Sequence, residues 1–444
     1  MSDLKQNIKN HKKIISIYGL GNVGGAIAAS WLRAGSKVIG VDLSDKLLKD
    51  IKTGRSHKKE PFVSEVFSKA LKSGNLVLTK DGVNASKNSD IKIIVVPVAI
   101  TRTKTDLSNV ISVAQTISKG LKKNDMVVLS PSVPPGTTEK ILLPILEHGS
   151  KLKGETDFSV VYNPERIFEG RAIQDIEENY PAIIAGLGKK STSFGKNLLK
   201  IISKKGVLVM SNLATAEAEK LFEGVFRDVN IALANQLANY STKIGINFWE
   251  ARIAANSQPY CHLHYPGTGV GGLCIPVYPR IIIESSKKVN APIDLLENCR
   301  DINDIMPKKC VKDSLKFFKQ FKNLSKIKKV SILGLGFRGE VTDKRLSPTY
   351  AVVKEFLKND YSIYVHDPYI LSDGELPSNV ILSNDLSKVT KDADLIFIST
   401  DHKKYSKLTE FSFKNSKQPV IIFDGRNILD KTKFKHTKIK TIGT

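Results

Sequence analysis

Short apolar runs alternate with longer amphipathic stretches along the chain, and the first apolar run leads directly into a glycine-rich turn. Residues 13–18 have the sequence KIISIY and residues 19–24 the sequence GLGNVG, after which apolar positions recur at helical spacing as far as Leu32. Residues 38–42, VIGVD, form the next apolar run. This pattern predicts a strand, a glycine turn, a helix and a second strand parallel to the first.

The same pattern recurs near the other end of the chain. Residues 329–333, KVSIL, lead to residues 334–339, GLGFRG, then to a helical stretch at 349–357 and a strand at 362–367. Other apolar runs typical of buried strands lie at residues 93–96, 126–129, 158–161, 182–185, 395–398 and 420–423. Alternation of strands with helices predicts an α/β protein with two doubly wound parallel sheets, each covered by helices on both faces.

A long helical segment separates the two repeats. Residues 214–243 contain no proline and only Gly224 as an interior breaker, and their apolar positions follow helical spacing. We predict a central helix that joins the two α/β domains and serves as a dimer interface. An ordinary core helix of one domain is the alternative. A chain of 444 residues has room for two or three domains.

Composition and charge limit the function classes. The chain is 41% apolar and 25% charged, as in a globular protein, and its net charge is +24. The lysines are spread along the chain rather than gathered in one arm, so a basic surface for anionic ligands is favoured over nucleic-acid binding, which stays a minor alternative. No apolar stretch is long enough to span a membrane, and the first residues lack the apolar core of a secretory signal, so we expect a cytoplasmic protein without a membrane partner.

The cysteine pattern argues against a disulfide scaffold and against a metal site. None of the four cysteines stands in a CxxC spacing, and only one of them has histidines nearby, His262 and His264. The four are Cys261, Cys274, Cys299 and Cys310. We therefore predict no metal.

Cys274 is the first candidate for a nucleophile, because it follows the glycine-rich sequence PGTGVGGL. Glycines let a backbone turn sharply, approach a ligand closely and present N–H groups to an anion. The alternative is a mobile surface turn followed by a buried thiol, because free cysteines are often small core residues.

The first glycine turn has the full context of a dinucleotide fingerprint: it follows a strand, opens a helix and is followed by Asp42 at the end of the next strand. The helix amino terminus would receive a pyrophosphate, and Asp42 would accept hydrogen bonds from the ribose hydroxyls, which favours NAD over NADP. The predicted NAD-binding residues in this unit are Gly19, Gly21, Asn22, Val23, Gly24 and Asp42. The second turn has Asp367 in the equivalent place, but this alone does not indicate a second NAD.

Three further segments carry polar residues that suit thiol chemistry. They are residues 132–138, SVPPGTT, residues 163–170, NPERIFEG, and residues 217–221, EAEKL. A nucleophilic cysteine needs a lysine to stabilise a developing oxyanion and a carboxylate to activate water. Each residue type is common alone, but together they supply both groups.

Taken together, these motifs resemble the UDP-glucose/GDP-mannose dehydrogenase family, particularly its members that oxidise UDP-N-acetylhexosamines. The resemblance covers nearly the whole chain and includes AEAEKLFEGVFRDVNIALANQLA, PGTGVGGLCIPV, RDINDIMP and LGLGFRG with RLSPT. It implies two Rossmann-like domains, the first for NAD and the second for UDP, in a homodimer that takes a UDP-sugar. The implied boundaries are 1–210 for the NAD domain, 211–326 for a central helical domain with Cys274, and 327–444 for the UDP domain.

The resemblance also implies roles for individual residues. Cys274 matches the nucleophile, Lys220 the lysine that stabilises the oxyanion, and Glu165 and Glu169 the two carboxylates, of which Glu169 would activate water. Ser132 stands where the family usually has a threonine that helps hold water and cofactor. Substrate-side positions, besides Lys220, are Arg166, Ile167, Arg227, Gly271, Arg338 and Arg345.

The implied reaction is a four-electron oxidation. One hydride leaves C6 of the sugar for NAD, Cys274 attacks the resulting aldehyde, a second hydride leaves the thiohemiacetal, and water releases the acid. The sequence GVGGLCIPV together with NPER favours UDP-N-acetyl-D-mannosamine over UDP-N-acetylglucosamine and UDP-glucose.

Several positions depart from the family pattern. Tyr278 replaces an aspartate, Gly224 an asparagine and Leu273 a histidine, and residues 258–260, QPY, replace His-Pro-Arg. The aspartate and the asparagine contact the water in the family. A second hypothesis is therefore a catalytically weakened paralogue that binds NAD and UDP-sugar without completing the oxidation.

Overall fold

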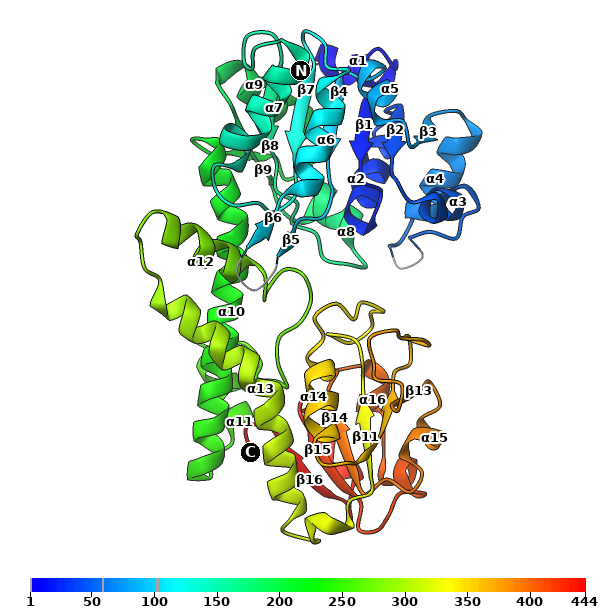
Figure 1. The fold of residues 1–444 in the computed structure, drawn as a ribbon, viewed down its shortest axis with the longest axis vertical. Helices are drawn as coiled ribbons and strands as arrows, with labels where there is room; N and C mark the ends of the chain where they lie inside the picture. Colours follow the sequence, from blue (N-terminus) through cyan, green and yellow to red (C-terminus); the bar gives the residue numbers. More distant parts are fainter. Residues whose placement is uncertain (1, 58–59, 101–103) are drawn as a thin grey trace. The chain divides into compact units, whose positions relative to one another are not determined.

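The computed structural model describes residues 2–57, 60–100 and 104–444 (Figure 1). Its contacts divide the chain into two compact units. The first unit comprises Met1–Glu223 with Arg280–Asn290, and the second comprises Gly224–Pro279 with Ala291–Thr444. Each unit contains one large sheet, as the two repeated patterns predict.

The first unit is built on an eight-stranded sheet in the order β10-β9-β8-β7-β4-β1-β2-β3. The strands are β1 Ile15–Tyr18, β2 Val38–Val41, β3 Leu76–Thr79, β4 Ile91–Ile94, β7 Met126–Leu129, β8 Ser159–Tyr162, β9 Ala182–Gly186 and β10 Val207–Val209. From β3 to β8 all neighbours are parallel, in the strand order of a dinucleotide-binding fold. A separate hairpin pairs β5 Ala99–Ile100 with β6 Thr105–Asp106.

One pairing in this sheet differs from the prediction of a wholly parallel sheet. β9 runs antiparallel to β8, with Tyr162 opposite Ala185. The segment between them holds only the short helices α8 Ala172–Gln174 and η2 Asp175–Asn179. A parallel neighbour requires a crossover across the sheet face, whereas this connection returns along the same edge.

Helices cover both faces of the first sheet (Figure 1). The helices are α1 Ser2–Lys9, α2 Asn22–Arg33, α3 Asp45–Lys52, α4 Val63–Lys72, α5 Gly82–Lys87, α6 Ser108–Ser118, α7 Leu143–Ser150 and α9 Lys189–Leu199. Trp31, Phe67 and Leu198 belong to the core cluster on one face, and Ile117 and Phe158 to that on the other. Burial on both faces explains why the strands have nearly continuous apolar runs.

The second unit repeats the architecture with six strands that are all parallel, in the order β13-β12-β11-β14-β15-β16. The strands are β11 Lys329–Leu333, β12 Ser362–His366, β13 Ile381–Ser383, β14 Leu395–Ile398, β15 Ile421–Asp424 and β16 Lys438–Thr441. Its helices are α11 Phe248–Asn256, α13 Asp294–Phe318, α14 Pro348–Leu357, α15 Leu386–Thr390 and α16 Lys403–Ser406. The six parallel strands β3-β2-β1-β4-β7-β8 of the first sheet and the six strands of the second sheet are arranged in the same order, once each set is numbered from its own first strand.

The predicted central helix is confirmed as α10, which spans Leu213–Ile244. The chain passes from the first unit to the second within this helix, between Glu223 and Gly224. It returns to the first unit within α12, which spans Tyr278–Lys288. Two absences hold for the described residues alone: no helix has the length and apolarity needed to cross a bilayer, and no three His, Cys, Asp or Glu side chains group to hold a metal.

Candidate active site

The first glycine turn lies at the carboxyl end of β1, where β1 and β4 are neighbours and the strand order reverses. Gly19 has a φ of +96°, and a Cβ there would lie 2.8 Å from the Val95 carbonyl oxygen. A Cβ on Gly24 would lie 1.9 Å from the carbonyl oxygen of Gly19. These two glycines therefore let the turn and α2 pack directly against the strands.

Gly21 differs from these two glycines because a Cβ there would meet nothing within 4 Å. It is also the N-cap of α2, and no side chain caps the helix there. Asn22 and Val23 begin α2, so their N–H groups belong to the first turn of the helix. Free N–H groups beside open space fit the pyrophosphate of a dinucleotide.

Asp42 follows β2 and reaches the same turn. Its Oδ2 accepts a hydrogen bond from the Leu20 N–H at 2.9 Å, and its Oδ1 accepts one from Ser44 N–H at 2.9 Å. The carboxylate stays partly exposed. The turn, the helix terminus and this acid together fit NAD, with the acid available to the ribose hydroxyls.

His57 is a neighbour of this turn that the sequence does not reveal. Its Nε2 lies 2.9 Å from the Leu20 carbonyl oxygen and 3.2 Å from that of Gly21. A Cβ on Gly25 would lie 2.3 Å from that nitrogen, so the glycine makes room for the ring. The ring thus supports the turn from the side of α2.

The second glycine turn, after β11, uses its acid differently. Asp367 is fully buried, and it accepts hydrogen bonds from the N–H groups of Leu335 and Gly336 at 2.8 and 3.0 Å and from His402 Nε2 at 3.2 Å. Burial acts to raise the pKa of Asp367, but the hydrogen bonds outweigh it and lower the pKa to about 2. This carboxylate holds its own turn and is not offered to a ribose.

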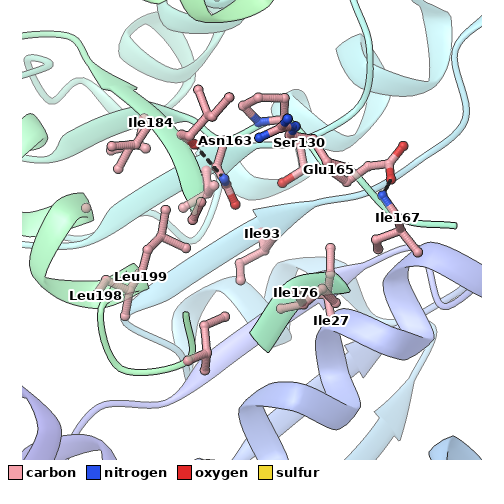
Figure 2. A pocket seen from close by; sticks show the side chains of 18 of the residues that line it. Ile27, Ile93, Ser130, Asn163, Glu165, Ile167, Ile176, Ile184, Leu198 and Leu199 are labelled. Atoms are coloured by element: carbon pink, nitrogen blue, oxygen red, sulfur yellow. Dashed lines mark hydrogen bonds between the residues drawn. The ribbon is translucent and has the colours of Figure 1, made fainter. Parts of the chain in front are cut away.

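In the first unit, two of the predicted catalytic residues lie close together. Glu165 follows β8, and its Oε1 lies 4.0 Å from Nζ of Lys220, which is largely buried in α10. Its Oε2 accepts a hydrogen bond from the Ile167 N–H at 3.1 Å. Glu165 lines a pocket of about 60 Å³. The side chains labelled in Figure 2 around this pocket are mostly apolar, among them Ile93 and Ile176. Burial raises the pKa of Glu165, and the Lys220 ammonium acts in the opposite direction.

Arg166 is held by two carboxylates of α10 that are not among the predicted site residues. Its Nη2 lies 2.7 Å from Oε1 of Glu223, and its Nε lies 3.8 Å from Oε1 of Glu219. The guanidinium also lies 5.0 Å from the ring centre of Tyr180. Burial, and then the neighbouring Glu223, raise the pKa of Glu219 to about 7.

Glu217 fixes the loop that carries Ser132. Its Oε1 accepts hydrogen bonds from the N–H and hydroxyl of Thr138 at 2.8 and 2.6 Å, and its Oε2 accepts one from the Gly136 N–H. Burial raises the pKa of Glu217, against the effect of these hydrogen bonds. In the sequence, two features could have indicated this contact: the polar segment PGTT and the glutamate near the start of the long helix.

Glu169 lies further along the same segment as Glu165, and Gly170 follows it. Glu60 accepts hydrogen bonds from the N–H groups of Gly170 and Ala172 at 2.8 and 3.1 Å. Burial raises the pKa of Glu60, and Glu169 is a nearby charge that acts in the same direction. The segment with the two predicted carboxylates is therefore anchored at both ends, by Glu165 itself and by Glu60.

In the second unit, the glycine-rich turn before Cys274 is tightly packed. Residues 266–269 are buried, and a Cβ on Gly271 would lie 2.6 Å from the carbonyl oxygen of Leu346. The Gly272 N–H donates to the carbonyl oxygen of Arg345 at 2.9 Å. Cys274 itself is exposed. The arrangement is the opposite of a mobile turn followed by a buried thiol.

A buried polar network holds this turn from α10 and α13. The Asn235 Oδ1 accepts a hydrogen bond from the Gly267 N–H at 2.9 Å, and its Nδ2 donates to Asn303 Oδ1 at 3.0 Å. Asn303 donates in turn to Asp228 Oδ1 at 2.8 Å, and Asp228 also pairs with Arg300. Parts of the FRDVN and RDINDI sequences therefore meet beneath the turn that leads to Cys274.

The two departures nearest to the cysteine contact each other. Tyr278 is 5% exposed, and its N–H donates to the Cys274 carbonyl oxygen at 2.9 Å, so its position is fixed one helical turn after the thiol. A Cβ on Gly224 would lie 2.4 Å from Cδ2 of Tyr278 and 3.1 Å from Cβ and Cγ of Tyr278. The tyrosine ring therefore takes the space that a side chain at position 224 would need.

The remaining substrate-side arginines belong to the second unit. The Arg345 guanidinium forms two hydrogen bonds to Asp343, with Nε 2.8 Å from Oδ1, and the Arg345 N–H donates a third. Arg338 lies in the second glycine turn, 5.9 Å from the ring centre of Phe337. Arg227 is exposed on α10. Cys274 and these arginines belong to one unit, and Lys220, Glu165, Glu169 and Ser132 to the other.

Family sequence models match three parts of the chain. The NAD binding domain of the UDP-glucose/GDP-mannose dehydrogenase family matches residues 13–203, its central domain residues 214–305, and its UDP binding domain residues 331–431. The matches together cover most of the sequence.

Individual relatives agree with these matches over nearly their full lengths. A UDP-N-acetyl-D-mannosamine dehydrogenase of Methanococcus aeolicus is 33% identical, with 94% of this chain and 91% of that protein covered. An NDP-N-acetyl-D-galactosaminuronic acid dehydrogenase of Ralstonia nicotianae is 30% identical, with 89% and 92% covered. The solved structure of a UDP-D-ManNAc dehydrogenase from Pyrococcus horikoshii superposes with a TM-score of 0.89 at 31% identity, covering 97% of this chain and 99% of that one.

Proposed function

We propose, from the premise that this chain belongs to the UDP-glucose/GDP-mannose dehydrogenase family, that it oxidises the C6 alcohol of UDP-N-acetyl-D-mannosamine to the uronic acid through Cys274. The chain is an NAD-dependent UDP-sugar dehydrogenase, an oxidoreductase with NAD as its cofactor. The substrate and the cysteine chemistry are the parts that we propose.

The carrying observation is the exposed Cys274 at the end of a packed glycine turn. A thiol on a rigid support can reach a bound sugar without losing orientation, which is what covalent catalysis needs. The names of the relatives support an N-acetylmannosamine substrate over an N-acetylgalactosaminuronic one, because the relatives with the higher identity are named as UDP-N-acetyl-D-mannosamine dehydrogenases.

The proposed reaction balances as two oxidations and one hydrolysis. When bound at the first glycine turn and Asp42, NAD would supply the hydride acceptor for both oxidation steps. In the first, the C6 alcohol loses a hydride and a proton and becomes an aldehyde. The Cys274 thiolate then adds to the aldehyde carbon, and loss of the second hydride leaves a thioester on Cys274. Water releases the carboxylic acid and the thiol.

The charged residues of the first unit are proposed to handle the protons. Lys220 would stabilise the oxyanion that forms when the thiolate adds, because an ammonium lowers the energy of a nearby alkoxide. Its separation of 4.0 Å from Glu165 keeps a counter-charge beside it. We assign activation of the water to Glu169 and a positioning role to Glu165 and Ser132. Glu217, which holds the Ser132 loop, is a positioning residue for the same group.

We propose the domain boundaries 1–210, 211–326 and 327–444 for NAD binding, for the central helical domain and for UDP binding. The three matched ranges, 13–203, 214–305 and 331–431, support this division. On the substrate side, Arg166, Ile167, Arg227, Gly271, Arg338 and Arg345 are proposed to contact the nucleotide sugar, with Arg345 released from Asp343 to do so.

We also propose a homodimer that forms through α10. Large apolar side chains on this helix are strongly exposed: Phe226 at 59%, Leu233 at 45%, Tyr240 at 57% and Ile244 at 51%. Their spacing of seven, seven and four residues places them along one face of the helix. Light scattering should give twice the chain mass, and Leu233→Glu with Tyr240→Glu should shift it to a monomer. A wild-type monomer at assay concentration would exclude this dimer.

The substrate proposal is tested by NADH formation with a panel of UDP-sugars. We expect the highest kcat/KM with UDP-N-acetyl-D-mannosamine, lower values with UDP-N-acetylglucosamine and UDP-glucose, and no rate without NAD. A higher kcat/KM for another sugar would overturn the assignment. No NADH with any sugar, in the presence of demonstrated NAD and UDP-sugar binding, would instead favour a catalytically weakened protein, which the comparisons do not favour.

A further inference from the structure

The second unit contains a cavity that none of the residues assigned to substrate or cofactor lines. It lies between α10, α13 and the end of β16, and its volume is about 350 Å³. That volume falls within the range of about 300–1,000 Å³ that is usual for small-molecule sites. Its lining includes four lysines, Lys243, Lys309, Lys316 and Lys440, against one acid, Asp313.

The lysines leave an excess of positive charge in the cavity. Lys309 pairs with Asp313 at 2.8 Å, and Lys440 donates to the main-chain oxygen of Thr444. No hydrogen bond or ion pair connects Lys243 or Lys316 to any residue that the structure describes. Burial lowers the pKa of Lys440, while Asp313 acts to raise it. An ammonium that has lost part of its water is stabilised by an anionic partner.

Thr441 supplies a second, independent indication. It is fully buried and lines the cavity, and its Oγ1 has no hydrogen-bond partner within the described parts of the chain. Buried hydroxyl groups are nearly always satisfied, so an unpartnered one in the wall of a cavity is suited to a ligand oxygen. The Asn239 side chain of α10 lines the same space and offers an amide.

We propose that this cavity is a binding site for a small phosphate-bearing anion, separate from the NAD and UDP-sugar sites. Lysines are common phosphate ligands that act as point charges, without the paired N–H geometry by which arginine recognises either phosphate or carboxylate. The lining contains lysines and no arginine. From α10 the cavity is lined by residues between Asn235 and Lys243, in the part of the helix that belongs to the second unit.

Inorganic pyrophosphate is the probe, used on the full chain by calorimetry with saturating NAD and UDP. Those two ligands occupy the other phosphate sites, so any remaining heat reports a further site. We expect one site per chain, with binding that weakens as salt rises because the lysines are partly exposed. The absence of binding under these conditions would overturn the proposal, and so would equal affinity for citrate, since the class would then not be phosphate.

The variants separate this cavity from the basic surface in general. Lys243→Gln with Lys316→Gln should weaken pyrophosphate binding by about tenfold or more, because two attractive charges are lost. The matched control is Lys312→Gln with Lys319→Gln, which removes the same charge from α13 and its C-cap, outside the cavity, and should leave the affinity unchanged. Equal losses in both pairs would contradict the proposal.

Thr441→Val tests the hydroxyl without changing the charge or the size of the side chain. We expect a loss of affinity of several-fold and an unchanged unfolding temperature, because the hydroxyl has no protein partner among the described residues. If Thr441→Val leaves the pyrophosphate affinity unchanged while the lysine variant weakens it, Thr441 is not part of the site. The proposal then rests on the lysine charges alone, and equal affinity for citrate would overturn it.

Discussion

Gly224→Ala should destabilise the protein, although a change from glycine to alanine inside a helix is normally favourable by about 1 kcal/mol. The reason is Tyr278, whose Cδ2 would lie 2.4 Å from the new Cβ. Tyr278 is buried and its own Cβ and Cγ would lie 3.1 Å from the new atom, so the ring cannot swing away about its base. Such overpacking of a core costs about 1–3 kcal/mol.

The size of the effect follows from setting these two contributions against each other. With Tyr278 present, Gly224→Ala should lower the free energy of unfolding by up to about 2 kcal/mol, since the overpacking cost of about 1–3 kcal/mol is offset by a helix propensity gain of about 1 kcal/mol. In a Tyr278→Ala background the clash is gone, and the same change should raise the free energy of unfolding by about 1 kcal/mol. The coupling in the double-mutant cycle is therefore about 1–3 kcal/mol, the overpacking cost itself.

The assay is urea unfolding of all four variants, followed by the fluorescence of Trp249, which lies in the second unit with both residues. The protein has two tryptophans, so Trp31→Phe in every variant isolates this signal. A stabilising Gly224→Ala with Tyr278 present, or additivity within about 0.5 kcal/mol, would refute the reasoning. The same contact predicts that Gly224→Asn restores a family asparagine only together with Tyr278→Asp.

Three further predictions concern chemistry and pH. Cys274→Ser should slow formation of the acid by about 10³-fold or more while NAD binding persists; an undiminished yield of acid would exclude the thiol mechanism. Asp367→Asn should lower the free energy of unfolding at pH 6 by about 2 kcal/mol, because the folded-state pKa of about 2 lies below the unfolded value of 3.8. That contribution is present above the unfolded pKa and is lost as the pH falls towards 2, so a variant difference that persists unchanged at pH 2 would contradict it. Glu219→Gln should raise the free energy of unfolding at pH 8 and have little effect near pH 4.5, because a carboxyl pKa raised from 4.5 to about 7 costs stability as the pH rises from 4.5 to about 7. Equal effects at both pH values would show that Glu219 is not held protonated by burial.

Much of the fold could be predicted because its strands are buried on both faces. Such strands have continuous apolar sequences, as in β1, β7 and β11. The long helix α10 was also predictable, because proline is absent from it and apolar residues recur at helical spacing. The glycine turns located the carboxyl ends of β1 and β11.

The missed strands lie at the edges of the sheets, where one side meets solvent. β16, with the sequence KIKT, lacks an apolar run, whereas β3, β10 and β13, with the sequences LVLT, VLV and ILS, are apolar but short and were not predicted. β4 begins at Ile91, whereas the prediction starts at residue 93. The prediction starts too late because Lys92 interrupts the apolar sequence. In the structure this lysine is buried and its charge is paired with Asp125. The strand β9 was predicted at residues 182–185, but its antiparallel direction could not be, because the sequence of a strand does not record the direction of its neighbour.

The candidate site likewise contains residues that the sequence could identify and residues that it could not. Cys274, Lys220 and Glu165 could be identified from motifs, whereas Glu217, which holds the Ser132 loop, and Glu223, which pairs with Arg166, have side chains that are common on any helix. Gly224 and Tyr278 appear in the sequence as two separate departures from a family pattern. The structure shows them as one packed pair, since the missing side chain at 224 is the space that the ring occupies.

The proposed four-electron oxidation is tested most directly by the ratio of NADH formed to sugar consumed. A limiting, known amount of UDP-N-acetyl-D-mannosamine is converted to completion with excess NAD, and the final NADH absorbance is measured. The proposal predicts a ratio of two, with one hydride from the alcohol and one from the adduct on Cys274. A ratio of one would contradict it, because the reaction would then stop at the aldehyde without the thioester that Cys274 is proposed to form.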